Sequence, residues 1–223
     1  MLDKPAGLKV HSGPGGGASV EDWFGQLSRR RDGPWLAHRL DADTSGCLVI
    51  ALRRAALHAA QECFATGCAG KTYWAVVQGE PPAPSGSITA ALLKINERSG
   101  WRMVADAQGL AARTEYIVRG HSDGLCWLEL RLLSGRTHQA RVHCASLGCP
   151  ILGDPVYGPP VRDEARQPEP GLHLLARAIH LPLDPPVTAV APPPPHMLAA
   201  LSACGYDVAA DTHRTLPSGV HAG

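Results

Sequence analysis

The segment HRLDADTSGCLVIAL, residues 38–52, joins the densest polar stretch of the chain to its longest wholly apolar run. The run Cys47–Leu52 has the length of a buried strand, so we predict a strand over residues 46–52. The next residues, 53–66, are rich in alanine and repeat apolar side chains at helical spacing. They predict a helix that Gly67 ends.

The polar residues 38–46 allow two interpretations. In one, Asp43, Thr44 and Ser45 bond to nearby backbone groups in a turn, while Asp41 merely pairs with Arg39. In the other, Asp41 belongs to a functional site, because reactive side chains are often carried by loops at strand edges. Taken alone, this segment favours the turn.

Short strands separated by turn residues dominate the rest of the chain. Strands are predicted over residues 71–79, 88–95, 101–105, 112–118, 125–133 and 172–183. Helices are predicted over 19–29, from a cap at Thr137 to about Leu147, and over 197–203. This pattern indicates an α+β fold with a mixed, mostly antiparallel sheet and flanking helices. We expect one folded domain over residues 1–205 and a flexible tail over residues 206–223.

Composition excludes several classes of protein. The 223 residues are 44% hydrophobic and 18% charged, which is too balanced for a disordered chain. The longest apolar run is far shorter than a membrane span, and a net charge of +1 excludes a non-specific polycation. Seven irregularly spaced cysteines suit free thiols in a reducing compartment, so we expect a cytoplasmic location without membrane association.

No sequence pattern supports a metal or a nucleotide cofactor. The chain has no CxxC pair and no HExxH pattern, and its glycine-rich segment 13–17 lacks the lysine and hydroxyl of a phosphate loop. Residues 130–153 contain three arginines and two histidines but no carboxylate. This positive window fits either a solvated face or a surface for an anionic partner.

Two long motifs resolve the choice left open for Asp41. Residues 38–46 match HRLDxxTSG, and residues 135–154 match GRTHQxRVHxxxLGxPILGD. Both resemble the RluA-type family of RNA pseudouridine synthases, and Lys4-Pro-Ala-Gly, Lys71-Thr-Tyr and Leu172-His fall in the same order as in that family. The resemblance covers residues 4–200 and implies the pseudouridine synthase fold with a central catalytic cleft. It also implies an isomerase that needs no cofactor.

The resemblance assigns catalytic roles to three residues. Asp41 corresponds to the catalytic aspartate, a nucleophile toward either the uracil ring or the ribose C1′. Arg141 corresponds to the arginine that pairs with this aspartate, where a bidentate guanidinium would keep the carboxylate ionised and aimed. Tyr73 corresponds to the active-site tyrosine, whose ring stacks on the extruded uracil and whose hydroxyl assists proton removal from C5.

The same resemblance implies RNA-binding residues. Arg39 matches the arginine that takes the place of the flipped-out base. Lys4, Arg136 and His138 are expected to contact the RNA backbone or to fix loops. The implied partner is a stem-loop of ribosomal or transfer RNA, without a metal and without an obligatory protein partner.

The chain departs from the family pattern in three places. Ala140 replaces a larger aliphatic residue, and Cys149 stands where histidine is common. Only Met1–Asp3 precede the first motif, which leaves two alternatives, a trimmed start or a sheet that lacks an edge strand. We also expect the domain to work without an S4-type RNA-binding module. A non-catalytic RNA-binding or folding factor stays as the alternative, and a nucleoside or glycoside hydrolase as a weaker one.

Overall fold

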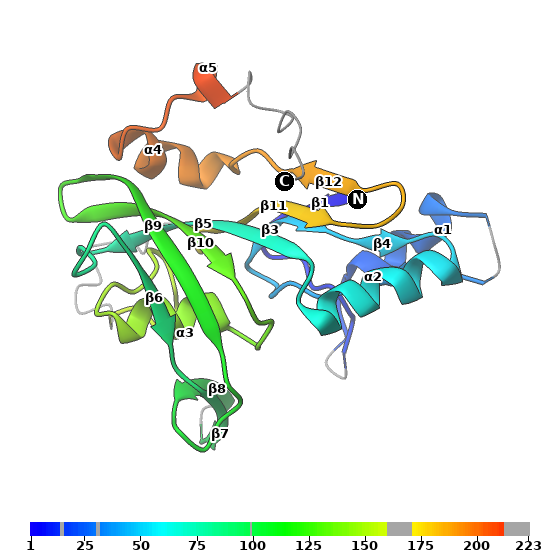
Figure 1. Ribbon diagram of the computed structural model, residues 1–223, viewed down its shortest axis with the longest axis horizontal. Coiled ribbons are helices and arrows are strands. Elements are labelled where there is room, and N and C mark those ends of the chain that lie inside the picture. Colours follow the sequence, from blue (N-terminus) through cyan, green and yellow to red (C-terminus); the bar gives the residue numbers. More distant parts are fainter. Residues whose placement is uncertain (14–15, 30–31, 99, 160–170, 212–223) are drawn as a thin grey trace, which may run out of the picture.

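The computed structural model describes residues 1–13, 16–29, 32–98, 100–159 and 171–211 (Figure 1). Its strands are β1 (Leu2–Lys4), β2 (Trp35–Leu36), β3 (Ser45–Leu48), β4 (Ile50–Ala51), β5 (Gly70–Gln78), β6 (Ser85–Thr89), β7 (Leu92–Glu97), β8 (Gly100–Ala105), β9 (Arg113–Ser122), β10 (Leu125–Leu132), β11 (Leu174–Leu181) and β12 (Val187–Val190). Its helices are a 3-10 turn (Val20–Trp23), α1 (Phe24–Leu27), α2 (Arg54–Thr66), α3 (Gln139–Ser146), α4 (Pro195–Ala203) and α5 (Val208–Asp211).

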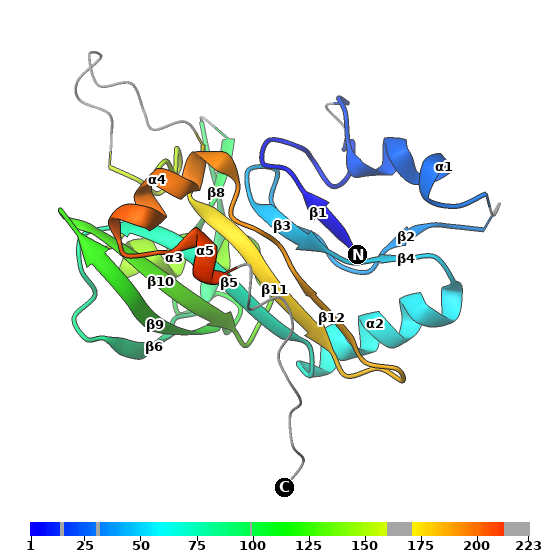
Figure 2. The same cartoon turned by 90° about the horizontal axis from the view of Figure 1, so that it is seen from above.

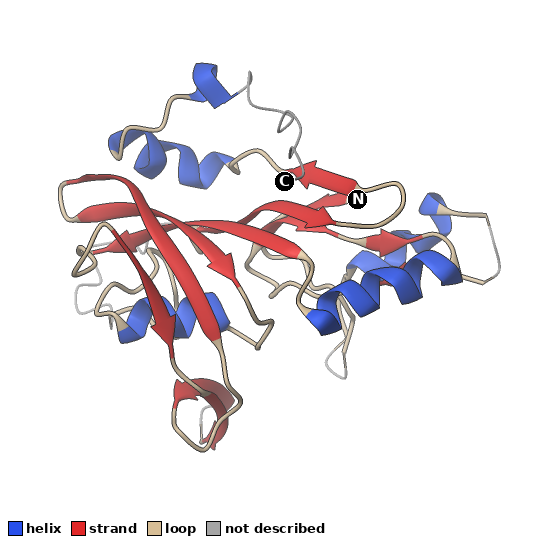
Figure 3. Cartoon of the chain, in the orientation of Figure 1, coloured by secondary structure: helices blue, strands red, loops and turns tan. Residues whose placement is uncertain are grey.

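The main sheet runs through the middle of the molecule (Figure 3). Within the described residues its strand order is β1-β3-β11-β5-β10-β9-β6, and β12 pairs with β11. The β3–β11 pair is parallel and the other pairs of this sheet are antiparallel. The predicted mixed, mostly antiparallel sheet is therefore confirmed. In β10, Leu128, Leu130 and Leu132 are buried, as their alternation with polar residues predicts.

Helices cover both faces of the central strand β5. Ala75 and Val77 share a buried cluster with Ala140 and Cys144 of α3, whereas Val76 on the opposite face belongs to the cluster that contains α4. Helix α2 lies beside β2 and β4 at one end of the sheet (Figure 2). None of the helices in the described ranges is long and apolar enough to cross a membrane.

The apolar run 46–52 is divided between two strands. β3 pairs with β1 and β11, whereas β4 pairs with β2. Between the two strands, the Val49 carbonyl accepts the Ala37 N–H at 3.2 Å. Both pieces are largely buried, so hydrophobicity alone could not show the change of partner. Gly46 lets β3 approach β11, because a Cβ on it would lie 2.3 Å from the Ala176 carbonyl oxygen, at a φ of +107°.

The predicted strand 88–95 is likewise two strands, β6 in the main sheet and β7 in a separate hairpin with β8. Between them, the carbonyl of Ala91 accepts the Asp106 N–H at 2.9 Å, which draws the backbone out of the β6–β9 ladder. β1, β2 and β12 form where no strand was expected. All three are short, and each is held by a neighbouring strand, which sequence periodicity does not report.

Helix α3 begins one residue later than the Thr137 cap predicts. Its N-cap is His138, which has the left-handed φ of +53° and makes no capping bond through its side chain. Helix α2 agrees with the prediction to within one residue: it runs from Arg54 to Thr66, and Gly67 caps it with a φ of +77°.

The folded chain continues beyond the predicted boundary at residue 205. Tyr206 is buried and its ring lies edge-on to Trp74 and Trp127, at 5.6 Å from each. Helix α5 follows, where Asp211 pairs with Arg177 and accepts the Tyr206 hydroxyl at 2.8 Å. A tail beginning at residue 206 is therefore wrong for residues 206–211, because an aromatic ring and a buried cation hold them. The rest of the expected tail, 212–223, lies outside the described residues.

Candidate active site

A cavity of about 540 Å³ opens between the loop before β3, the strand β5 and the segment that leads into α3. All the predicted site residues except Lys4 contribute to its walls: Arg39, Asp41, Tyr73, Arg136, His138 and Arg141. They come from three segments that are far apart in the sequence. The fold therefore gathers the two long motifs around one space.

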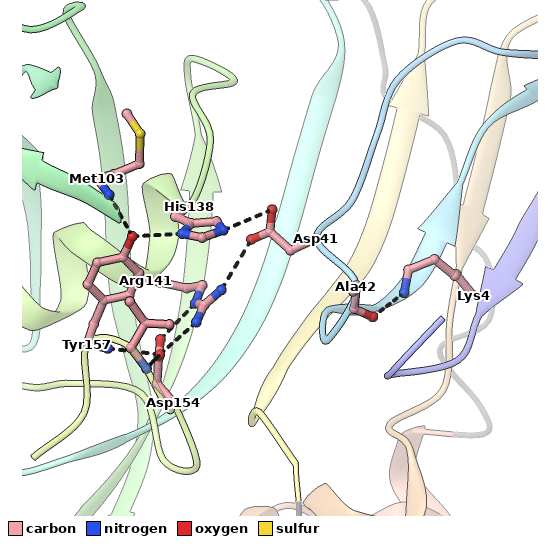
Figure 4. A network of polar contacts seen from close by, with 9 residues as sticks. Lys4, Asp41, Ala42, Met103, His138, Arg141, Asp154 and Tyr157 are labelled. Carbon is pink, nitrogen blue, oxygen red and sulfur yellow. Dashed lines mark hydrogen bonds and ion pairs between the residues drawn. The ribbon is translucent and has the colours of Figure 1, made fainter. Parts of the chain in front are cut away.

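Asp41 projects from its loop toward the side chains of the α3 region (Figure 4). Its carbonyl accepts the Thr44 N–H at 3.2 Å, so residues 41–44 form a backbone turn. The side-chain bond expected of Ser45 is not formed, because within the described residues its buried hydroxyl has no hydrogen-bond partner. Its carboxylate nevertheless faces across the cavity. Oδ1 lies 3.8 Å from His138 Nε2 and Oδ2 lies 3.9 Å from Arg141 Nη1, and the side chain is 21% exposed. The segment therefore forms a turn, but the carboxylate of Asp41 faces His138 and Arg141, as the second interpretation expects of a site residue.

Arg141 does not form the expected bidentate pair with Asp41. Its Nε and Nη2 donate to Asp154, at 2.8 and 2.7 Å, and Asp154 also accepts the N–H groups of Val156 and Tyr157. Nη1 is left to face Asp41. The expected pair with Asp41 is wrong because the loop after α3 brings the Asp154 carboxylate closer to the guanidinium than the Asp41 loop brings Asp41.

The Arg141–Asp154 pair is almost completely buried, with the two side chains 3% and 0% exposed. Burial alone raises the pKa of Asp154, but the hydrogen bonds and charge of Arg141 outweigh it and hold this pKa below its ordinary value. Sequence reasoning missed Asp154 as a site residue. The available signal was its position as the last residue of the second motif.

Tyr73 lines the cavity from β5, beside Asp41. Burial, together with the negative charge of Asp41, raises its pKa above the ordinary value. The side chain is therefore a neutral phenol at physiological pH. It can stack on a base or donate a hydrogen bond, whereas action as a phenolate base is disfavoured.

His138 lies against Asp41, at the start of α3, with a side chain only 14% exposed. Its Nδ1 is 2.7 Å from the hydroxyl of Tyr157, and its ring stacks on Trp101 with centroids 5.1 Å apart. Burial lowers its pKa despite the opposing charge of Asp41, so the imidazole is neutral at pH 7. The structure places it on the cavity wall beside the carboxylate.

Lys4 is fully buried, and its predicted role as an RNA contact is wrong. Its ammonium donates to the carbonyls of Pro5, Leu8 and Ala42 at 2.8, 2.8 and 2.7 Å. Burial lowers its pKa to about 8, against the opposing charges of Asp43 and Asp41. Since Ala42 directly follows Asp41, the expected loop-fixing role is the one that its contacts support (Figure 4).

Arg39 and Arg136 line the cavity and are exposed, as an RNA contact requires. Arg136 Nε donates to the Ala111 carbonyl at 3.2 Å. Lys71, the first residue of the Lys71-Thr-Tyr segment, adds a positive charge to the cavity wall and donates to the Ser134 carbonyl at 2.8 Å. The described residues contain no group of three or more His, Cys, Asp or Glu side chains placed to hold a metal ion.

Curated proteins that are similar to this chain are named as pseudouridine synthases of RNA or of the large ribosomal subunit. It is 40% identical over 141 residues to an uncharacterized RNA pseudouridine synthase of Zymomonas mobilis, covering 62% of this chain and 64% of that one. It is 34% identical over 140 residues to ribosomal large subunit pseudouridine synthase C of Haemophilus ducreyi, covering 62% and 44%. The chain thus spans less than two thirds of these relatives' length.

Solved structures show the same fold over nearly the whole chain. Human RNA Pseudouridylate Synthase Domain Containing 4 matches with a TM-score of 0.76 at 27% identity, covering 91% of this chain and 88% of that one. Human RNA Pseudouridylate Synthase Domain Containing 1 gives 0.73 at 28% identity, covering 98% and 91%. The predicted fold class is confirmed. A family model described as RNA pseudouridylate synthase matches residues 1–146, and the chain belongs to that family.

Proposed function

We propose that this protein isomerises uridine to pseudouridine in a structured RNA, with Asp41 as the nucleophile. The observation that carries the proposal is the position of the partly exposed Asp41 carboxylate in the cavity. It faces the buried Arg141, whose guanidinium is already paired with Asp154. Arg141 can therefore favour ionised Asp41 without covering it. A neutral Tyr73 beside the carboxylate offers a ring on which a uracil base can stack.

The chemistry balances without an external reactant. Asp41 attacks the uracil ring or the ribose C1′ as the N1–C1′ bond breaks, and C1′ is then joined to C5. The proton leaves C5, and N1 gains one, so substrate and product have the same composition. The target base must leave its stack to enter the cavity, at a cost of a few kcal/mol. Exposed Arg39 at the cavity rim is suited to fill the vacated position.

The substrate that we propose is a stem-loop of ribosomal or transfer RNA, modified in the cytoplasm without an obligatory protein partner. The names of the similar proteins support an RNA substrate. The exposed arginines at the cavity provide phosphate contacts, although the chain as a whole has a net charge of only +1. Recognition by the shape of a folded loop fits such a restricted positive surface.

The test is release of tritium from bulk ribosomal and transfer RNA labelled at C5 of uridine, since pseudouridine formation expels that hydrogen. Wild type should release it from at least one pool, and Asp41→Asn should reduce release below detection while RNA affinity and melting temperature stay nearly unchanged. Asp43→Asn is the matched control, because this neighbouring carboxylate is exposed and lies outside the cavity. It should retain wild-type release.

Three outcomes would contradict the proposal. Full activity of Asp41→Asn would exclude the aspartate mechanism. RNA binding by wild type without tritium release from either pool would favour the non-catalytic RNA-binding factor. Free uracil or a released sugar among the products would instead indicate a hydrolase.

A further inference from the structure

A chain of polar contacts connects His138 to the β7–β8 hairpin through Tyr157 (Figure 4). The backbone N–H of Met103, on β8, donates to the Tyr157 hydroxyl oxygen at 3.0 Å. The same oxygen lies 2.7 Å from His138 Nδ1. On the other side of the imidazole, Nε2 faces Asp41 Oδ1 at 3.8 Å. The imidazole thus stands between a phenol and the proposed nucleophile.

Counting protons selects one tautomer of His138. A neutral imidazole carries its proton on one nitrogen only. If Nε2 were bare, its lone pair would face the negative carboxylate of Asp41, which is repulsive. With the proton on Nε2, the ring directs an N–H toward Asp41, and Nδ1 accepts the Tyr157 hydroxyl proton. Because Met103 already donates to the Tyr157 oxygen, the phenol proton is free to point at Nδ1.

The ring is also held in orientation by packing. Trp101 of the hairpin stacks on it with an interplanar angle of 27°, and the Tyr157 ring meets it edge-on at 80°. The Tyr157 ring in turn lies 5.1 Å from the Arg141 guanidinium. Burial favours the neutral imidazole among the charges of Asp41, Arg141, Asp154 and Arg39 that surround it. Both the tautomer and the direction of Nε2–H are therefore fixed before substrate arrives.

We propose that Tyr157 is a positioning residue that holds His138 as the Nε2–H tautomer, so that His138 donates to Asp41 when the site closes on RNA. At 3.8 Å the contact is longer than a hydrogen bond, as catalytic contacts often are before substrate binds. Asp41 would then be oriented through both oxygens, one by His138 and the other by Arg141. This inference rests on the proposed function of Asp41.

The test begins with Tyr157→Phe, which removes the hydroxyl and keeps the ring against Arg141. With the imidazoles labelled with nitrogen-15, NMR of the free protein should show His138 as the Nε2–H tautomer in wild type and as a mixture in the variant. The His138 signal is assigned by its loss in His138→Gln. At saturating RNA, Tyr157→Phe should lower kcat about tenfold, the order of one lost hydrogen bond, while KM changes less than twofold. Tyr206→Phe, which removes a remote buried hydroxyl, should leave kcat unchanged.

A double variant separates positioning from a general structural effect. Gln at position 138 keeps an amide donor near the place of Nε2 but has no tautomer to set. Tyr157→Phe should therefore lower kcat no further in the His138→Gln protein than His138→Gln alone. A wild-type His138 in the Nδ1–H form, or a tenfold loss that repeats in that background, would overturn the proposal. Wild type without tritium release would overturn the proposed function instead, since the NMR result does not depend on turnover.

Discussion

Replacing Asp154 by asparagine tests the buried ion pair that orients the site. The substitution leaves the Arg141 guanidinium, 3% exposed, with one amide oxygen and a distant Asp41 as its acceptors. Removing one partner of a buried pair costs about 3–5 kcal/mol because an uncompensated charge remains. The surviving amide acceptor and Asp41 place the expected loss of unfolding free energy near the lower limit, about 3 kcal/mol. For a domain of this size the melting temperature should fall by about 6–12 °C.

The assay is urea unfolding followed by circular dichroism, with tritium release measured on the same preparations. Glu129→Gln is the matched control, because it neutralises one partner of the Arg119–Glu129 pair, whose side chains are 42% and 19% exposed. That change should cost less than about 1 kcal/mol. Turnover of Asp154→Asn should also fall, since the released guanidinium can close the 3.9 Å gap and cover Asp41. A loss for Asp154→Asn no larger than that of the control would refute this account of the pair.

Three further predictions concern pH, the Asp41 loop and the sheet. Folding lowers the pKa of Asp154, so the stability that its carboxylate adds should be complete above its unfolded pKa near 4 and should be lost as pH falls through the lower folded pKa. The difference in urea stability between wild type and Asp154→Asn should therefore shrink below about pH 4. Lys4→Met should lower turnover but leave RNA affinity within twofold, because Lys4 is buried and holds the Asp41 loop through Ala42. Tritium release measures turnover and filter binding measures affinity. A large loss of affinity alone would contradict the loop-fixing role. Gly46→Ala should cost more than about 3 kcal/mol or prevent folding, whereas Gly25→Ala, whose Cβ meets no atom within 4 Å, should melt within a few degrees of wild type.

Local sequence patterns predicted the elements whose neighbours do not change along their length. Helix α2 follows from its alanine-rich periodicity and from Gly67, and β10 follows from leucines at alternate positions. The runs 46–52 and 88–95 failed because each changes its pairing partner in the middle. Hydrophobic periodicity reports burial, and burial continues across the change, so the break leaves no trace in the pattern.

The sequence by itself determined which residues gather at the candidate site. The two motifs predicted Asp41, His138 and Arg141, and all three line one cavity. Motif spacing could not determine which carboxylate the long side chain of Arg141 reaches, because that depends on how the loop at Asp154 folds back on α3. Nor could it show that Lys4, the last residue of β1, is fully buried and anchors the Asp41 loop through the Ala42 carbonyl. Only the tertiary structure decided these pairings, since hydrogen bonds and burial depend on distances between segments that are remote in the chain.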